Sequence, residues 1–102
     1  MPKLTIRDRL RVVELRLQDR KLSRQARRCE ARSRYLLAEI QRILTQAQER
    51  EIVDVGGAKR IEAELHQLQG MVPTLTRLRN EVIRELNALT GSSFPTFPET
   101  GA

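Results

Sequence analysis

No glycine or proline interrupts the chain between Thr5 and Arg50, and this stretch constrains the fold more than any other feature of the sequence. Arg, Leu, Glu, Gln and Ala dominate it, and all of them favour helices. Thr5 with Asp8 three residues later forms a pattern similar to a capping box, which satisfies free amides at a helix start. We therefore predict one helix over about residues 5–51, which at about 1.5 Å per residue is roughly 70 Å long.

The apolar residues of this stretch follow alternating three- and four-residue steps, which is the spacing of a coiled-coil seam. The predicted seam consists of Val12, Leu15, Leu22, Ala26, Cys29, Ser33, Leu36, Ile40, Ile43 and Ala47. Asp19 is the one misfit between Leu15 and Leu22. The middle of the seam is made of small residues, so a partner helix can approach closely there but buries little area. We expect Cys29, the single cysteine, to behave as a small buried hydrophobic residue.

Gly56 and Gly57 are the clearest turn signal in the chain, and we predict a loop over 52–57. A second helix is predicted over about 58–90. Its apolar positions repeat the same steps, with Arg79 as the exception: Ile61, Leu65, Leu68, Val72, Leu75, Val82, Leu86 and Leu89. The fold class is therefore all-α, an antiparallel two-helix coiled-coil hairpin.

Two breaker residues shape the second helix and its end. Pro73 lacks a backbone donor and crowds the preceding turn, so it predicts a kink or a short break near 70–73. The heptad phase continues across this position, which favours a kink. Gly91 lies where a helix-ending glycine is common. Residues 91–102 are rich in Pro, Ser, Thr and Gly, and we predict a non-helical tail.

Folding the chain about Val55 predicts that Leu86 lies near Leu22 and that the second helix ends opposite about residue 19. Residues 1–18 would then overhang the hairpin, unless the tail folds back along them. This segment carries a second apolar stripe, formed by Ile6, Leu10, Val13 and Leu17. A helix that is apolar on two faces needs a further partner, so these four residues are predicted to bind another protein or a second copy. A four-helix homodimer, in which the overhang completes the core, is the simplest alternative.

The tail contains Phe94 and Phe97, the only phenylalanines of the chain. Two aromatic residues in an otherwise polar segment suggest that it docks into a groove of a partner. A flexible terminus is an equally acceptable interpretation, because a segment of this composition is disordered when alone.

Most of the positive charge belongs to the first helix. Residues 1–50 contain 14 basic and 6 acidic residues, and residues 51–102 contain 5 and 7. Six basic residues are predicted to form a ridge opposite the seam: Arg20, Lys21, Arg24, Arg27, Arg28 and Arg34. Such a ridge suits solvent, an acidic protein surface or a nucleic-acid backbone. Nucleic acid is the least favoured of the three, because no aromatic residues are interleaved with the arginines.

No catalytic, cofactor or metal motif is visible, so we expect no enzyme activity, cofactor or small-molecule substrate. His66 has Glu62 four residues before it, but further ligands are missing and an ordinary exposed histidine is the better interpretation. A single cysteine excludes an internal disulfide framework. No apolar run approaches the roughly 20 residues of a membrane span. The charged N-terminal residues do not resemble a cleavable secretory signal, so the expected location is the cytoplasm or a virion or secretion assembly.

The sequence thus favours a non-enzymatic structural or adaptor subunit of a larger protein assembly, for example of a phage or virus particle or a secretion machine. Partners would bind its apolar helix faces and its tail. Two alternatives remain open at this point. One is a basic coiled coil that binds nucleic acid non-specifically through phosphates, and the other is a homodimeric regulatory hairpin.

Overall fold

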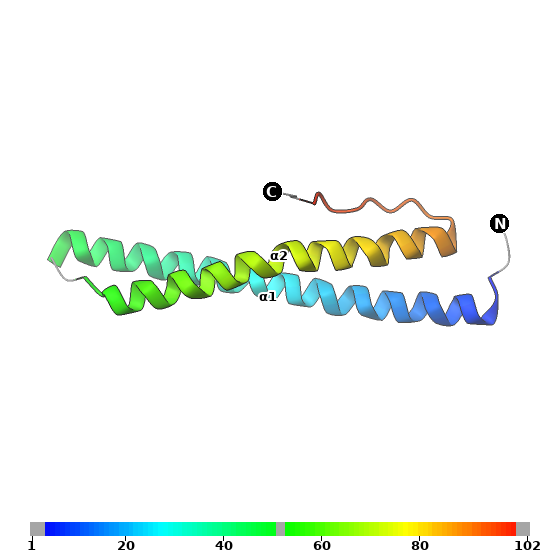
Figure 1. The fold of residues 1–102 in the computed structure, drawn as a ribbon, viewed down its shortest axis with the longest axis horizontal. Coiled ribbons are helices and arrows are strands. Elements are labelled where there is room, and N and C mark those ends of the chain that lie inside the picture. Colours follow the sequence, from blue (N-terminus) through cyan, green and yellow to red (C-terminus); the bar gives the residue numbers. More distant parts are fainter. Residues whose placement is uncertain (1–3, 51–52, 100–102) are drawn as a thin grey trace. The chain divides into compact units, whose positions relative to one another are not determined.

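The structure is a computed structural model that describes residues 4–50 and 53–99. It contains two helices, α1 over Ile6–Arg50 and α2 over Val55–Thr90, followed by a non-helical tail (Figure 1). The two helices pack against each other, and no strand occurs in the described residues. The prediction of an all-α helical hairpin is therefore confirmed.

The chain forms two compact units, and each helix contributes one segment to each of them. Unit 1 comprises Met1–Ala26 and Pro73–Ala102, and unit 2 comprises Arg27–Val72. Unit 1 therefore contains the start of α1, the end of α2 and the tail. Unit 2 contains the end of α1, the start of α2 and the connection between them.

The seam predicted on α1 forms the core of both units. Val12, Leu15 and Leu22 of α1 are buried in unit 1, and so are Leu75, Val82 and Ile83 of α2. Cys29, Leu36 and Ile43 are buried in unit 2. The remaining positions of the α1 seam are half-buried. On α2, Val72 is exposed although it was predicted to belong to the seam, and Ile83 is buried without having been predicted.

Both helices begin with a side-chain cap. At α1, the Asp8 amide donates to Thr5 Oγ1 over 3.1 Å and the Thr5 amide donates to Asp8 Oδ2 over 3.4 Å, which confirms the capping box. At α2, the amide of Gly57 donates to Asp54 Oδ1 over 2.9 Å. The glycine pair thus lies in the first turn of α2 rather than in the predicted loop over 52–57, because Asp54 caps the helix before them. Residue 52 of that loop lies outside the described residues.

The end of α2 agrees with the sequence. Gly91 has a φ of 69°, the left-handed conformation that glycine adopts without steric cost, and its amide donates to the carbonyl of Asn87. Pro73 lies inside α2 and the helix continues through it, so the predicted break does not occur. A kink at this residue stays a prediction.

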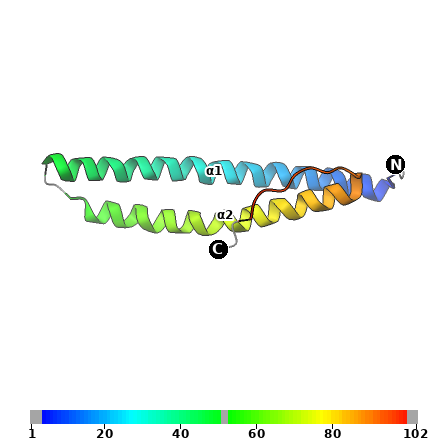
Figure 2. The ribbon, with the colours of Figure 1, turned by 90° about the horizontal axis from the view of Figure 1, so that it is seen from above.

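The predicted register and the N-terminal overhang are wrong. In unit 1, Arg11 pairs with Glu85, whereas the prediction placed the neighbouring Leu86 opposite Leu22. The shift amounts to roughly three helical turns. In unit 1, the first turns of α1 are therefore paired with the last turns of α2. In unit 2, α2 begins alongside α1 and short of its C-terminal end, as Figure 2 shows, instead of at a symmetric turn about Val55.

Candidate functional site

The apolar stripe of α1 remains uncovered although α2 pairs with this part of the helix. In unit 1, Ile6, Leu10, Val13 and Leu17 are 79%, 62%, 55% and 58% exposed. Val12 and Leu15 of the same turns are buried against α2, so the stripe lies on a different face of α1. Its spacing of four, three and four residues keeps the side chains on one side of the helix. The structure places the four predicted residues together on one exposed face of α1.

The predicted basic ridge is exposed at all six positions. In unit 1 it consists of Arg20, Lys21 and Arg24, and in unit 2 of Arg27, Arg28 and Arg34. Arg34 pairs with Glu30, because an acidic residue four positions earlier lies within reach on a helix. Within the described part of the chain, the other five form no ion pair with another residue.

Two bidentate ion pairs join the helices, one in each unit. In unit 1, Arg11 donates from Nε to Glu85 Oε1 over 2.7 Å and from a terminal nitrogen to Oε2 over 2.9 Å. In unit 2, Arg32 donates to the two oxygens of Glu64 over 2.7 and 3.1 Å. These hydrogen bonds stabilise the ionised carboxylates and lower the pKa of Glu85 and of Glu64. The two pairs therefore specify which residues of α1 and α2 face each other in their own unit.

The tail lies along α2 in unit 1 and is attached through its main chain (Figures 1 and 2). Asn80 accepts a hydrogen bond from the Phe97 amide and donates one to the Phe97 carbonyl, both over 2.8 Å. Asn87 makes the same two bonds with Phe94, both over 3.0 Å. Each asparagine amide thus satisfies the donor and the acceptor of one tail residue.

Asn80 is the most buried polar side chain of the described residues, with none of its surface exposed. A buried amide is costly unless its polar atoms are bonded, and here its bonds go to the tail. Its Nδ2 also donates to Glu99 Oε1 over 3.1 Å, and Glu99 lies 3.5 Å from Arg84. The tail therefore satisfies a polar group that the helical hairpin leaves without another partner in the described residues.

The aromatic residues of the tail are engaged unequally. The guanidinium of Arg79 stacks over the Phe97 ring at 4.0 Å from its centroid and donates to Ser23 Oγ over 3.2 Å. Phe94 is 59% exposed and Phe97 41% exposed. The tail therefore docks mainly through its backbone, and both phenylalanines stay largely exposed.

A cavity of about 410 Å³ lies beside the tail within unit 1. It is lined by residues of α1, α2 and the tail, namely Arg16, Asp19, Arg79, Ile83, Leu86, Thr90, Ser92, Phe94, Pro95 and Phe97. The Nε atom of Arg79 is buried and has no hydrogen-bond partner in the described residues. The tail side chains thus leave open space between the tail and the helices.

Analysis of the sequence missed both asparagines. They are the only two in the chain and lie seven residues apart on α2, although asparagine is a poor helix former. Each Phe is followed by Pro, and the two Phe-Pro pairs lie three residues apart. The seven-residue spacing of the asparagines and the three-residue spacing of the Phe-Pro pairs could together have indicated the contact between α2 and the tail.

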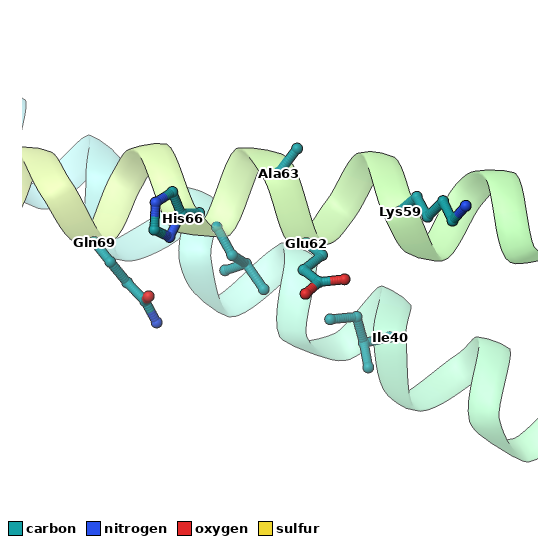
Figure 3. Close-up of a pocket in the computed structure, with 7 residues that line it drawn as sticks. Ile40, Lys59, Glu62, Ala63, His66 and Gln69 are labelled. Atoms are coloured by element: carbon teal, nitrogen blue, oxygen red, sulfur yellow. The ribbon is translucent and has the colours of Figure 1, made fainter.

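His66 lines a shallow cavity of about 500 Å³ in unit 2. Figure 3 shows it on α2 with Glu62, Lys59 and Gln69, and with Ile40 of α1 on the other side. Among residues 4–50 and 53–99, no three His, Cys, Asp or Glu side chains are grouped closely enough to bind a metal ion. This cavity therefore contains one histidine beside charged and amide side chains, and the described residues form no group of metal ligands there.

The chain matches no protein-family model, no curated protein and no solved structure. In the described part of the chain, neither helix has an apolar stretch that could cross a membrane.

Proposed function

We propose that the chain is a non-enzymatic structural or adaptor subunit of a larger protein assembly, and that it binds a helix of a neighbouring subunit through the α1 stripe. The observation that carries the proposal is the exposure of Ile6, Leu10, Val13 and Leu17, each more than half accessible. An amphipathic helix normally buries its large apolar side chains, and a contiguous exposed row of them is typical of an interaction surface.

The spacing of the stripe suits a helical partner. Residues four and three positions apart repeat on one face of α1 with the same period as the seam that α2 covers. A partner helix with an apolar seam can therefore lie along the stripe with its side chains between those of α1. The exposed Arg20, Lys21 and Arg24 of the same unit favour acidic residues beside that seam.

The tail is the second proposed contact of the adaptor. The exposure of Phe94 and Phe97 supports this role, because aromatic side chains contribute large contact areas to interfaces. Docking of the tail backbone on α2 orders both rings before a partner arrives, which lowers the entropic cost of binding.

The decisive experiment changes the stripe without touching the core. Leu10→Asp combined with Leu17→Asp places two charges on the stripe, while Val12 and Leu15 remain in place. We expect the wild-type chain to sediment as an assembly heavier than one chain. The double variant should sediment at the mass of one chain, and its far-ultraviolet circular dichroism should be unchanged. Gln18→Asp with Gln25→Asp is the matched control, because both glutamines are exposed on the same helix and the added charge is equal.

Assembly of the stripe variant would contradict the proposal. A stable wild-type dimer that binds no hydrophobic dye would instead favour the homodimeric regulatory hairpin, because its apolar stripe would then be buried between the two copies. Aggregation or loss of helix in isolation, relieved by a second subunit, would support the adaptor.

Non-specific binding of nucleic acid is the second candidate function, and the five ridge residues without an ion pair favour it. Binding of labelled duplex DNA and single-stranded RNA should then weaken steeply with salt. Replacing Arg20, Arg24, Arg27 and Arg28 with Gln should reduce the slope of log K against log salt by about 0.9 for each lost phosphate contact on duplex DNA. Lys59→Gln with Arg60→Gln on α2 is the control, and an unchanged slope in the ridge variant would exclude this function.

A further inference from the structure

The Asn80–Asn87 face of α2 has the chemistry of a peptide-binding site. We propose that it binds an extended segment with two Phe-Pro pairs three residues apart, and that the tail of a second copy can occupy it in exchange for the chain's own tail. The site depends on contacts within unit 1 that do not involve the α1 stripe. This inference therefore goes beyond the proposed function and can be tested independently of it.

The spacing of the two asparagines matches an extended proline-containing segment. Seven residues of helix advance about 10.5 Å along the axis. Three residues of a polyproline II segment advance about 9.3 Å. The two asparagine side chains span the difference of about 1 Å, and the observed bonds of 2.8–3.0 Å show that both fit at once. A ligand with a different period could satisfy only one asparagine.

Recognition through the main chain explains why proline belongs to the ligand. Proline restricts its own φ and confines the residue before it to extended conformations, so Phe94 and Phe97 have little backbone freedom to lose. Their amides remain available as donors, and Asn87 and Asn80 accept hydrogen bonds from them. The stacking of Arg79 on the Phe97 ring adds a preference for an aromatic side chain at that position.

The docked tail is only lightly attached, which permits exchange. Its residues from Ser93 to Glu99 are all exposed, and the cavity of about 410 Å³ lies beside them. Its connection to α2 is Gly91, Ser92 and Ser93, in which Gly91 already adopts a left-handed conformation. A tail that leaves its site exposes Asn80 and Asn87, and the tail of a second copy offers the same contacts.

The occupant is a second copy because this chain contains a segment of the required pattern. Intramolecular docking profits from an effective concentration of about millimolar, so each tail occupies its own site in dilute solution. Within an assembly, neighbouring copies reach comparable local concentrations. Tail exchange would then link one subunit to the next without any new type of contact.

A complementation experiment with full-length chains tests the exchange. The groove variant carries Asn80→Ala and Asn87→Ala and retains its tail. The tail variant carries Phe94→Pro and Phe97→Pro, which remove the two donated amides, and retains its asparagines. The groove variant is labelled with ¹⁵N, and hydrogen exchange of its Phe94 and Phe97 amides is measured by NMR before and after addition of the unlabelled tail variant.

We expect both amides to exchange freely in the groove variant alone and to become at least tenfold slower, in a saturable manner, when the tail variant is added. A chain that carries all four substitutions is the control and should cause no change, because it offers no asparagines. Protection by the control chain would overturn the proposal, and so would absence of protection by a tail variant whose circular dichroism shows intact helices.

A second measurement leaves the chain unaltered. The ¹⁵N-labelled wild-type chain is titrated to about millimolar concentration with a synthetic peptide of residues 91–102, since that is the range of the effective concentration to be overcome. We expect exchange of the Phe94 and Phe97 amides of the chain to accelerate as the peptide replaces the tail. The same peptide with both phenylalanines changed to proline should have no effect. Equal responses to the two peptides, or none to either, would overturn the proposal. Loss of assembly through the stripe would leave these results unchanged.

Discussion

The cap of α2 leads to a prediction in which two neighbouring glycines respond differently to the same substitution. Replacing glycine by alanine within a helix ordinarily stabilises it by about 0.5–1 kcal/mol, because alanine loses less backbone entropy. A Cβ atom on Gly56 would lie 4.0 Å from Asp54 Oδ1, an ordinary contact. Gly56→Ala should therefore raise the free energy of unfolding by up to about 1 kcal/mol.

At Gly57 the same methyl group collides with the cap. Its Cβ would lie 2.8 Å from Asp54 Cγ and 3.1 Å from Oδ1, so the carboxylate must rotate away. Rotation breaks the bond of 2.9 Å from the Gly57 amide, and losing such a cap costs about 1 kcal/mol. The gain in helix propensity and the loss of the cap offset each other, so Gly57→Ala should change the free energy of unfolding by less than about 0.5 kcal/mol.

A double-mutant cycle measured by urea denaturation, followed by circular dichroism, isolates the collision. Asp54→Ala alone should destabilise the chain by about 1 kcal/mol. In that background Gly57→Ala should stabilise the chain as much as Gly56→Ala does, giving a coupling energy of about 1 kcal/mol between Asp54 and Gly57. Additive effects, or full stabilisation by Gly57→Ala with Asp54 present, would refute the reasoning.

The other predictions concern the tail, the core and acid stability. Asn80→Ala removes both bonds to the Phe97 backbone, worth about 1 kcal/mol each, so hydrogen exchange of the Phe97 amide should accelerate by about 30-fold while amides buried in the helices keep their rates. Leu15→Ala should lower the free energy of unfolding by about 2–5 kcal/mol, whereas Leu17→Ala should change it by less than about 0.5 kcal/mol, because Leu15 is 1% and Leu17 58% exposed. The lowered pKa of Glu85 contributes stability above the ordinary glutamate pKa of 4.5, and this contribution is lost as the pH falls through the folded value. Glu85→Gln should therefore flatten the pH dependence of urea unfolding in acid; an unchanged dependence would show that its ion pair adds no pH-dependent stability.

The two helices and the seam of α1 were predictable because their determinants are local. The absence of Gly and Pro between Thr5 and Arg50, the pairing of Thr5 with Asp8 and the glycine at position 91 each act within a few residues. Periodicity then identifies the buried face, and the α1 seam is buried or half-buried at every predicted position. Exposure of the α1 stripe follows from the same periodicity, because a second apolar face cannot point toward the same partner helix.

The register was not predictable from periodicity, because a heptad pattern repeats and allows several alignments that each bury the seam. Asp54 starts α2 before the glycine pair, and the α1–α2 ion pairs of Arg11 and Arg32 select one alignment in each unit. The two ion pairs join residues that are far apart in the sequence, so the sequence does not state that they are close in space. The predicted overhang failed for this reason.

The sequence by itself therefore determined the helices, the buried seam of α1, its exposed stripe and its basic character, since each depends on neighbours along one helix. Only the tertiary structure decided which turns of α1 meet which turns of α2, and that the tail lies on Asn80 and Asn87. Those outcomes depend on hydrogen bonds between groups that are distant in sequence or belong to the backbone. A main-chain amide is the same for almost every residue type, so the sequence contains no direct record of where it will be bound.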